Sequence, residues 1–340
     1  MKVARYYGAG DIRIEDVTLP EAGPGEIVIR IKASGICGSD VMHWYRQGRG
    51  PVVLGHEIGG EIAAVGEGVT AYKSGDRVGA SHHVPCNTCH YCRTGHDTVC
   101  DTLRSTNFYP GGFAEFVRLP AVNVDRGVYS LPEGMSYEEA TFIEPLACVY
   151  RGQRIAGMGI HRSVLVMGSG ISGLLHVQLA RALGASFVAA TDVNAYRLDA
   201  ARRFGADAVI DAGEDVPATF RDINNGRPAD IVILTTGAER AIIQALQSVD
   251  RGGTVLFFAP ANKGTSVPLP VNDLFWRNEI TLTSSYAANY REHMMSMEII
   301  RQGRVNVRDM ITHRLPLEKT AEGFRIVESA GESLKVIITP

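Results

Sequence analysis

The chain has 340 residues, more than one hydrophobic core usually serves, so two domains are expected. Its composition is 45% hydrophobic and 21% charged, and 34 Lys and Arg residues against 37 Asp and Glu residues give a net charge of -3. Because the sequence contains no basic stripe and no block of like charge, composition argues against nucleic acid or a membrane surface as a partner.

The N-terminus and the cysteines indicate the compartment. Residues 1–7 lack the apolar core of a signal peptide, and no stretch of about 18 uninterrupted apolar residues is present to span a bilayer. We therefore expect a cytoplasmic protein. Four of the six cysteines lie between positions 86 and 100, where thiolates in a reducing compartment bind a metal ion more readily than they form disulfides.

The first 146 residues are expected to be mostly β. Residues 27–33 alternate apolar and polar side chains after a Pro-Gly turn, which predicts a strand. Two further strand-like runs, 61–65 and 77–80, are separated by glycine-rich turns. Strands of this kind form a rigid frame for loops that carry functional side chains.

Three separated segments of this frame carry metal-binding side chains. Cys37 supplies a thiol, Gly55-His56-Glu57 supplies an imidazole and a carboxylate, and Glu144 supplies a second carboxylate. Three protein ligands of these types leave a fourth position open on Zn²⁺ for water or a substrate, as a catalytic zinc requires. We therefore expect a catalytic zinc site, and the residues leave open whether Glu57 or Glu144 is the direct ligand.

A second metal site is expected in the cysteine-rich loop. Its pattern is Cys-x2-Cys-x2-Cys-x7-Cys, formed by Cys86, Cys89, Cys92 and Cys100. The bacterial iron–sulfur run has three residues before its last cysteine and a proline after it, whereas this loop has seven and then an aspartate. The spacing therefore favours one tetrahedral structural zinc ion. Four nearby histidines are expected to be loop or surface groups: His82, His83, His90 and His96.

From residue 162 the pattern changes to alternating strands and helices. A short apolar strand, 163–167, runs directly into a Gly-x-Gly-x-x-Gly motif, and helical spacing follows over 174–183. In this context the glycines permit a tight turn, and the N–H groups at the helix start bind the pyrophosphate of a dinucleotide. The predicted phosphate-binding residues are Gly168, Gly170, Ile171, Ser172 and Gly173.

The next strand, 186–191, ends at Asp192. An acidic side chain there accepts hydrogen bonds from the adenosine ribose and repels a 2′-phosphate, so it favours NAD over NADP. The alternative role for Asp192 is to cap the following helix, with Asn194 beside it. Arg197 is placed either to cover the adenine or to lie exposed on its helix. Thr236, at the carboxyl end of a later strand, is expected to bind the nicotinamide half.

Four more strand candidates complete the pattern, at 208–210, 230–234, 253–258 and 279–283. With helices between most of them, they predict an α/β fold with a six-stranded, doubly wound parallel sheet. A Met-rich helix over 293–300 and a last strand over 334–339 are expected to rejoin the first domain. The predicted domains are therefore residues 1–146 with 286–340, carrying the zinc sites, and residues 147–285, binding the nucleotide.

Together these motifs resemble the zinc-containing medium-chain dehydrogenase/reductase superfamily. The match lies in Cys37-Gly38-Ser39-Asp40 and in the glycine-rich run from Gly55-His56-Glu57 to Gly75-Asp76-Arg77-Val78. The resemblance covers the whole chain and is strongest to sorbitol and threonine dehydrogenases. It implies a GroES-like, mostly-β catalytic domain, a Rossmann domain with NAD, two zinc ions per chain, and a homodimer or homotetramer paired through the edge of the Rossmann sheet.

The resemblance also implies roles at the catalytic zinc. In these relatives the position of Glu57 binds or approaches zinc, and the position of Glu144 supports it directly or through water. Ser39 matches the hydroxyl that receives the alcohol proton. Four loop aromatics are candidates for the substrate pocket: Trp44, Tyr45, Phe108 and Tyr109.

This chain departs from its relatives at two positions. In many relatives a relay histidine follows the first cysteine ligand by five residues, where this chain has Met42 and then His43. If residues 39–47 form one helix, His43 points away from Ser39, because each helical residue turns by about 100°; if the loop holds an extra residue, His43 still serves. Sorbitol dehydrogenases also carry an Arg-Tyr pair where this chain has Ser285-Tyr286, which removes a donor to a polyol.

The sequence therefore predicts a zinc-dependent enzyme that transfers a hydride from a small-molecule secondary alcohol to NAD, giving a ketone. The alcohol is expected to be a polyol, a sugar alcohol or a hydroxy amino acid. The alternatives are a zinc-free quinone or enoyl reductase of the same superfamily and a non-catalytic nucleotide-binding protein. Both should lack Cys37, His56, Glu57 and Glu144 as a set, and all four are present.

Overall fold

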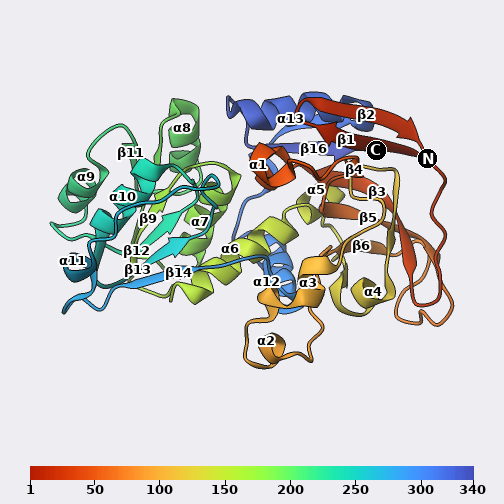
Figure 1. The fold of residues 1–340 in the computed structure, drawn as a ribbon, viewed down its shortest axis with the longest axis horizontal. Helices are drawn as coiled ribbons and strands as arrows, with labels where there is room; N and C mark the ends of the chain where they lie inside the picture. The colour runs from red at the N-terminus through yellow and green to blue at the C-terminus, as the bar shows by residue number, and fades with distance from the viewer. The chain divides into compact units, whose positions relative to one another are not determined.

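The computed structural model describes residues 1–340 and divides the chain into two compact units (Figure 1). Unit 1 contains residues 1–147, 287–302 and 307–340, and unit 2 contains residues 148–286 and 303–306. The end of the chain therefore belongs to the same unit as its beginning. Helix α6, Ile143–Ile155, carries the chain from unit 1 into unit 2.

Unit 1 is built on two β-sheets. The larger has seven strands, in the order β15-β16-β3-β5-β6-β8 with β7 also paired to β3, and the smaller has the order β2-β1-β4. The strands of unit 1 are β1 (Lys2–Gly8), β2 (Asp11–Asp16), β3 (Ile27–Gly35), β4 (Val52–Val53), β5 (Glu57–Val65), β6 (Arg77–Ala80), β7 (Phe116–Leu119), β8 (Val128–Ser130), β15 (Ile311–Pro316) and β16 (Lys335–Thr339).

Short helices connect these strands and cover them. The helices of unit 1 are η1 (Gly38–Val41), α1 (His43–Arg46), α2 (His90–Arg93), η2 (Asp97–Val99), α3 (Asp101–Ser105), α4 (Ala121–Gly127), α5 (Tyr137–Ala140), α12 (Tyr290–Arg301), η3 (Arg308–Met310), η4 (Leu317–Lys319) and α13 (Thr320–Ser329). Helix α13 lies beside the β1–β2 hairpin (Figure 1).

The alternation of side chains explains the core of unit 1. In β3, Ile27, Ile29 and Ile31 are buried and contribute to one hydrophobic cluster, whereas Arg30 between them is exposed. A second cluster joins the small sheet to β16 and α13, with Phe324 of α13 as a buried member. The two clusters fix the strands whose ends and loops carry the predicted metal ligands.

Unit 2 is the predicted doubly wound sheet. Its six parallel strands have the order β11-β10-β9-β12-β13-β14. Figure 1 shows α7 and α8 on one side of this sheet and α9 and α10 on the other. The elements are β9 (Ser163–Met167), α7 (Ile171–Ala182), β10 (Phe187–Asp192), α8 (Ala195–Arg203), β11 (Ala208–Asp211), α9 (Val216–Ile223), β12 (Ala229–Leu234), α10 (Glu239–Ser248), β13 (Val249–Phe257), α11 (Val271–Phe275) and β14 (Thr281–Ser284).

The α/β fold class is confirmed, and one predicted boundary is wrong. The strand expected over 61–65 begins at Glu57, so the His-Glu pair lies at the start of a strand and not in a free loop. The first half of β5 is buried, and this removes the period-two alternation that would have revealed it. No helix of the chain is long and apolar enough to cross a membrane.

Candidate metal and cofactor sites

The four cysteines of the predicted structural site lie together, with every pair of sulfur atoms within 4.8 Å. The Sγ atoms of Cys86 and Cys92 are 3.9 Å apart, and those of Cys89 and Cys92 are 3.6 Å apart. Four sulfurs about 2.3 Å from one zinc ion are about 3.8 Å from each other, so the spacing fits a tetrahedral site. All six cysteines are free, so no disulfide competes for these thiols.

Hydrogen bonds favour the thiolate form of Cys86, whereas burial raises the pKa of the Cys92 thiol. The hydroxyl and the backbone N–H of Thr88, together with the backbone N–H of Cys89, donate to the sulfur of Cys86. These bonds lower the pKa of the Cys86 thiol to about 5. Because the thiolate is the form that binds zinc, the loop is suited to the ion at neutral pH.

A second group of donor atoms joins Cys37, His56 and Glu57, again within 4.8 Å of one another. The sulfur of Cys37 lies 3.5 Å from the backbone N of Ser39 and 3.4 Å from the Ser39 hydroxyl, which both donate to it. Gly55 has a φ of +93°, and a Cβ there would lie 2.9 Å from neighbouring backbone. Glycine is therefore required for the turn that presents His56.

Negative charge surrounds these donors. Burial lowers the pKa of His56, but the Cys37 thiolate and the Asp40 carboxylate outweigh burial and raise this pKa well above its usual value. Oδ1 of Asp40 lies 3.8 Å from Nδ1 of His56, and Oδ2 accepts the backbone N–H of Cys37. The charges that draw a proton to His56 would attract a divalent cation in the same way, so the donor set fits zinc.

The two candidate carboxylates differ in their surroundings. Glu57 is 2% exposed, and one of its oxygens contacts the ammonium group of Lys335, which is 1% exposed. Glu144, in the first turn of α6, lies outside the group of donor atoms within 4.8 Å. Its charge nevertheless contributes to the raised pKa of His56. Glu57 is thus a member of the donor group, and Glu144 is its neighbour.

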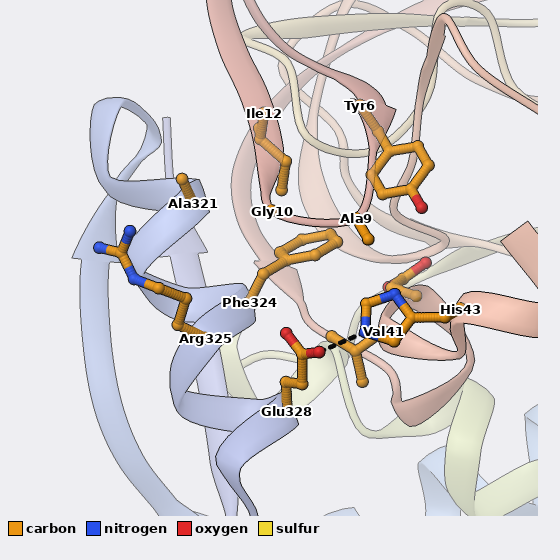
Figure 2. Close-up of a pocket in the computed structure, with 11 residues that line it drawn as sticks. Tyr6, Ala9, Gly10, Ile12, Val41, His43, Ala321, Phe324, Arg325 and Glu328 are labelled. Atoms are coloured by element: carbon orange, nitrogen blue, oxygen red, sulfur yellow. Dashed lines mark hydrogen bonds and ion pairs between the residues drawn. The ribbon is translucent and has the colours of Figure 1, made fainter. Parts of the chain in front are cut away.

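His43 and Ser39 are separated in the structure. Met42 has an extended conformation between η1 and α1, so the single helix considered over residues 39–47 does not form. The imidazole of His43 instead contacts the carboxylate of Glu328 on α13, beside a small pocket (Figure 2). No hydrogen bond joins His43 to Ser39 or to the donor cluster.

Arg46 is the basic side chain next to Ser39. Its Nε donates to the backbone oxygen of Ser39 at 2.9 Å, and its Nη2 lies 3.4 Å from the Ser39 hydroxyl and 3.1 Å from Oδ1 of Asp40. The guanidinium groups of Arg46 and Arg49 also lie over the ring of Tyr45. With its side chain 12% exposed, Arg46 neutralises the buried Asp40 and holds the loop that carries Ser39.

Two of the histidines expected at loop or surface positions, His82 and His83, lie in the loop after β6, and His82 contacts the ring of the donor His56. The ring centroid of His82 is 4.7 Å from that of His56 and 3.7 Å from that of His83. Burial lowers the pKa of His82 well below its usual value and lowers that of His83 to about 4. His90 and His96 are exposed, as expected.

The predicted pocket aromatics also differ in how much of each side chain is exposed to solvent. Phe108 is 1% exposed, and its ring centroid is 6.1 Å from that of His82. Trp44 and Tyr109 are 39% and 48% exposed. Phe108 is therefore a core residue beside His82, whereas Trp44 and Tyr109 present much of their surface to solvent.

In unit 2, the glycine motif forms the turn between β9 and α7. Gly168 has a φ of +100°, and a Cβ on Gly173 would overlap the backbone oxygen of Gly168. Gly170 precedes the helix, and a Cβ there would meet only the guanidinium of Arg197, 3.9 Å away. The first-turn N–H groups of Ile171 and Ser172 have no partner within the helix, so this end of α7 offers donors and space to a phosphate.

Asp192 lies at the carboxyl end of β10, buried beside the glycine turn. Its Oδ2 accepts the backbone N–H of Ser169 at 2.8 Å, and its Oδ1 accepts that of Asn194 at 2.9 Å. Asn194 itself caps α8, so the alternative role of Asp192 as the helix cap is wrong. The Nε atom of Arg197 is buried without a hydrogen-bond partner. An unpaired buried donor facing this turn fits a site that a nucleotide completes.

Thr236 follows β12 at the same edge of the sheet. Its hydroxyl accepts the backbone N–H of Ala238, and the neighbouring hydroxyl of Thr235 donates to the backbone oxygen of Gly168 at 2.7 Å. The carboxyl ends of β9, β10 and β12 therefore bring the predicted cofactor residues to one edge of unit 2.

Lys335 is a site residue that could not be recognised from the sequence. It lies 278 residues from Glu57, and a single basic residue in a C-terminal apolar strand carries no sequence signal for an ion pair. Asp40 was part of a recognised motif, and its place three residues after Cys37 is that of a capping box at η1. That spacing could have identified Asp40 as a residue that orients the first metal ligand.

Two family models match this chain. The family model described as "Alcohol dehydrogenase GroES-like domain" matches residues 23–132, and "Zinc-binding dehydrogenase" matches residues 172–300. Sorbitol dehydrogenase of Gallus gallus is 32% identical, over 98% of this chain and 94% of its own length.

Two solved structures are similar over the whole chain. A protein of Sinorhizobium meliloti 1021, solved with NADP bound, is 27% identical with a TM-score of 0.89, covering 100% of this chain and 99% of its own. The 2R,3R-butanediol dehydrogenase of Bacillus subtilis is 26% identical with a TM-score of 0.88 and the same coverage.

Proposed function

Since the chain belongs to the zinc-containing medium-chain dehydrogenase/reductase superfamily and is an oxidoreductase, we propose that it oxidises a secondary alcohol to a ketone and transfers the hydride to NAD. The substrates proposed are polyols, sugar alcohols and hydroxy amino acids. The polyol class is supported by the similarity to sorbitol dehydrogenase over nearly the whole chain.

One observation carries the proposal. A thiol, an imidazole and a carboxylate, from Cys37, His56 and Glu57, lie within 4.8 Å of one another, and the hydroxyl of Ser39 is 3.4 Å from the thiol. Three such donors leave room for the oxygen of an alcohol in a fourth position. A site of this composition has no purpose in a zinc-free reductase or in a protein that only binds nucleotide.

The residues around the donors have distinct tasks in the reaction. Bound zinc would supply the positive charge that favours loss of the alcohol proton, and bound NAD would supply the acceptor of the hydride. Ser39 takes the proton from the alcohol oxygen and passes its own hydroxyl proton on to water, while the carbon–hydrogen bond breaks, the hydride leaves and the carbonyl forms. Arg46 holds Ser39 in place, and Asp40 accepts the backbone N–H of Cys37 and so positions that metal donor.

We propose two zinc ions per chain. The structural ion is held by Cys86, Cys89, Cys92 and Cys100. The catalytic ion is held by Cys37, His56 and Glu57, and Glu144 takes part directly or through water. The charge of Glu144 at His56 supports its part in this second site.

We propose NAD as the preferred cofactor, bound by the glycine turn and by Asp192, with Arg197 and Thr236 completing the site. Asp192 supports NAD because its buried carboxylate lies where a ribose would bind, and a 2′-phosphate there would be repelled. The similar protein solved with NADP makes this preference a question for direct measurement.

The remaining proposals concern the relay and the assembly. His43 is proposed to lie outside the proton relay, which is supported by its contact with Glu328. The enzyme is proposed to be a cytoplasmic homodimer or homotetramer.

The experiment that tests this function is a substrate panel followed by the absorbance of NADH. Polyols, 3-hydroxy amino acids, simple secondary alcohols and sugar phosphates should be offered with NAD and, separately, with NADP. Oxidation of one or more secondary alcohols is expected. Activity on a quinone and on none of the alcohols would contradict the proposal.

A further inference from the structure

His82 is a partly buried imidazole without a hydrogen bond. Its Nδ1 atom is fully buried and has no hydrogen-bond partner within the protein. Buried polar groups in folded proteins are almost always paired, because an unpaired one loses its hydration without compensation. The structure offers no partner for His82 within the protein, so the partner is expected to come from outside the chain.

The segment that carries His82 is held firmly in place. The side-chain amide of Asn123 donates to the backbone oxygens of Ser81 and His82, at 3.0 and 2.9 Å. The hydroxyl of Ser81 donates to the backbone oxygen of His83 at 2.8 Å. The unpaired ring is therefore presented by a fixed backbone, which is the arrangement that a recognition residue needs.

The His82 ring lies next to the metal donors, where the substrate is expected to react. His82 packs on one side against His56, a member of the metal-donor group, and its ring centroid is 6.1 Å from that of Phe108. An alcohol oxygen placed among the metal donors would bring the adjacent carbons of the substrate alongside these rings. A substituent on the carbon next to the reacting one would then meet the imidazole.

The hydrogen-bonding capacity of the ring selects the kind of substituent. A neutral imidazole has one donor and one acceptor nitrogen, and a hydroxyl group can pair with either. An ammonium group could pair only with the acceptor nitrogen. A neutral hydroxyl therefore suits this position better than the amino group of a hydroxy amino acid.

We propose that His82 is a specificity-determining residue that hydrogen-bonds a second hydroxyl, on the carbon adjacent to the one oxidised. The substrate class is then a vicinal diol or polyol, in preference to an isolated secondary alcohol or an amino alcohol. This inference rests on the proposed function and names the substrates of the same site.

The test compares butane-2,3-diol with butan-2-ol in wild-type enzyme and in His82→Phe, which keeps an aromatic ring and removes both nitrogens. Wild type should prefer the diol in kcat/KM, and His82→Phe should lower the diol-to-monool ratio by at least about tenfold, the effect of one lost hydrogen bond. His82→Gln, which restores a donor and an acceptor, should recover part of the ratio.

Stability provides a second readout, with His83→Phe as the matched control. His83 is bonded to the backbone oxygen of Thr106 through Nδ1, at 3.0 Å, so its replacement loses a real hydrogen bond. His83→Phe should lower the melting temperature and leave the diol-to-monool ratio unchanged. His82→Phe should leave the melting temperature unchanged or raise it, because no bond within the protein is lost.

Three results would overturn the proposal for His82: an unchanged ratio in His82→Phe, an equal fall of the ratio in His83→Phe, or a clear loss of melting temperature in His82→Phe. Wild-type enzyme that oxidises neither of these alcohols and none of the polyols, hydroxy amino acids and secondary alcohols of the substrate panel, with either dinucleotide, would refute the proposed function itself. That outcome is visible before any variant is compared, and it would remove the basis for the His82 proposal as well.

Discussion

At the scale of single residues, the position of Asp192 bears on cofactor choice. Its carboxylate is buried at the end of β10 and already accepts the N–H groups of Ser169 and Asn194, so it is fixed where the ribose is expected. We predict that Asp192→Ala narrows the preference for NAD over NADP by about 1–3 kcal/mol, through loss of the ribose contact and of the repulsion. Steady-state kinetics with both cofactors measure this.

Asp211 offers a matched control for Asp192. It lies at the carboxyl end of the neighbouring strand β11, opposite Asp192 in the parallel register, and it is exposed. Asp211→Ala should leave the cofactor preference unchanged. Wild-type enzyme that uses NADP as well as NAD would show that Asp192 does not set the preference.

The second residue-scale prediction separates Ser39 from His43. Ser39 lies beside the Cys37 sulfur, whereas the imidazole of His43 contacts Glu328. Ser39→Ala should therefore lower turnover by about 10² or more, and His43→Ala should lower it by less than about 10², the usual loss for a general acid–base group. Glu328→Gln is the matched control and should resemble His43→Ala. A large loss in His43→Ala that added imidazole restores would return this histidine to the relay.

A third residue, His176, affects stability in acid. It is fully buried on α7, Nε2 of Gln153 lies 3.2 Å from its Nδ1, and burial lowers its pKa to about 3. An unfolded histidine titrates near pH 6.5, so below that pH the unfolded state binds the additional proton. Its contribution to stability is therefore complete above about pH 6.5 and falls between about pH 6.5 and 3, by on the order of 1 kcal/mol per pH unit.

His176→Asn removes this titration and keeps an acceptor for the Gln153 amide. The melting temperature of wild type should fall more steeply than that of the variant between pH 7 and pH 5, although the variant is less stable at pH 7 because its smaller side chain leaves a cavity. Thermal unfolding of both proteins across this range measures the difference. Parallel curves would show that His176 does not titrate as its burial implies.

At the scale of secondary-structure elements, an ion pair links three neighbouring strands. Lys335 on β16 reaches across β3 to Glu57 on β5, and it passes over Gly35, where a Cβ would overlap both side chains. Lys335 is also 5.4 Å from the ring centroid of Phe142. The ion pair therefore links β16, the last strand, to β5, which begins with the metal donor Glu57.

Lys335→Met should leave the Glu57 carboxylate buried without its cation. The expected loss of stability is about 3–5 kcal/mol, and the double variant Lys335→Met with Glu57→Gln should recover much of it because no uncompensated charge remains. Thermal unfolding after removal of metal isolates this effect from zinc binding. A double variant no more stable than the single one would show that the ion pair is not what the single substitution disrupts.

Some of these elements were predictable from the sequence, and others were not. The strand at 163–167 and the glycine turn were predictable because a short apolar run, a glycine motif and a helical period follow one another locally. The start of β5 was not predictable, because burial on both faces removes the alternation of apolar and polar side chains. The Lys335–Glu57 pair and the stacking of His82 on His56 depend on segments that are distant in sequence, and no local pattern encodes such contacts.

At the scale of the whole molecule, the chain separates its tasks between two compact units. Unit 1 contains both groups of metal donors, and unit 2 contains the glycine turn and Asp192. The two groups of metal donors were predictable because cysteines at short spacing and a His-Glu pair among glycines have few other uses. The contact of Arg46 with Ser39 and Asp40 became evident only from the folded loop.

We propose that the Cys37 site holds a zinc ion that alcohol oxidation requires. The most direct measurement is the zinc content of purified wild-type and Cys37→Ala protein, combined with NADH formation from a polyol before and after chelation. We predict about two zinc ions in wild type and about one in Cys37→Ala, with activity absent from the variant and restored to chelated wild type by added zinc. Equal zinc contents in the two proteins, or full activity after removal of the metal, would contradict the account.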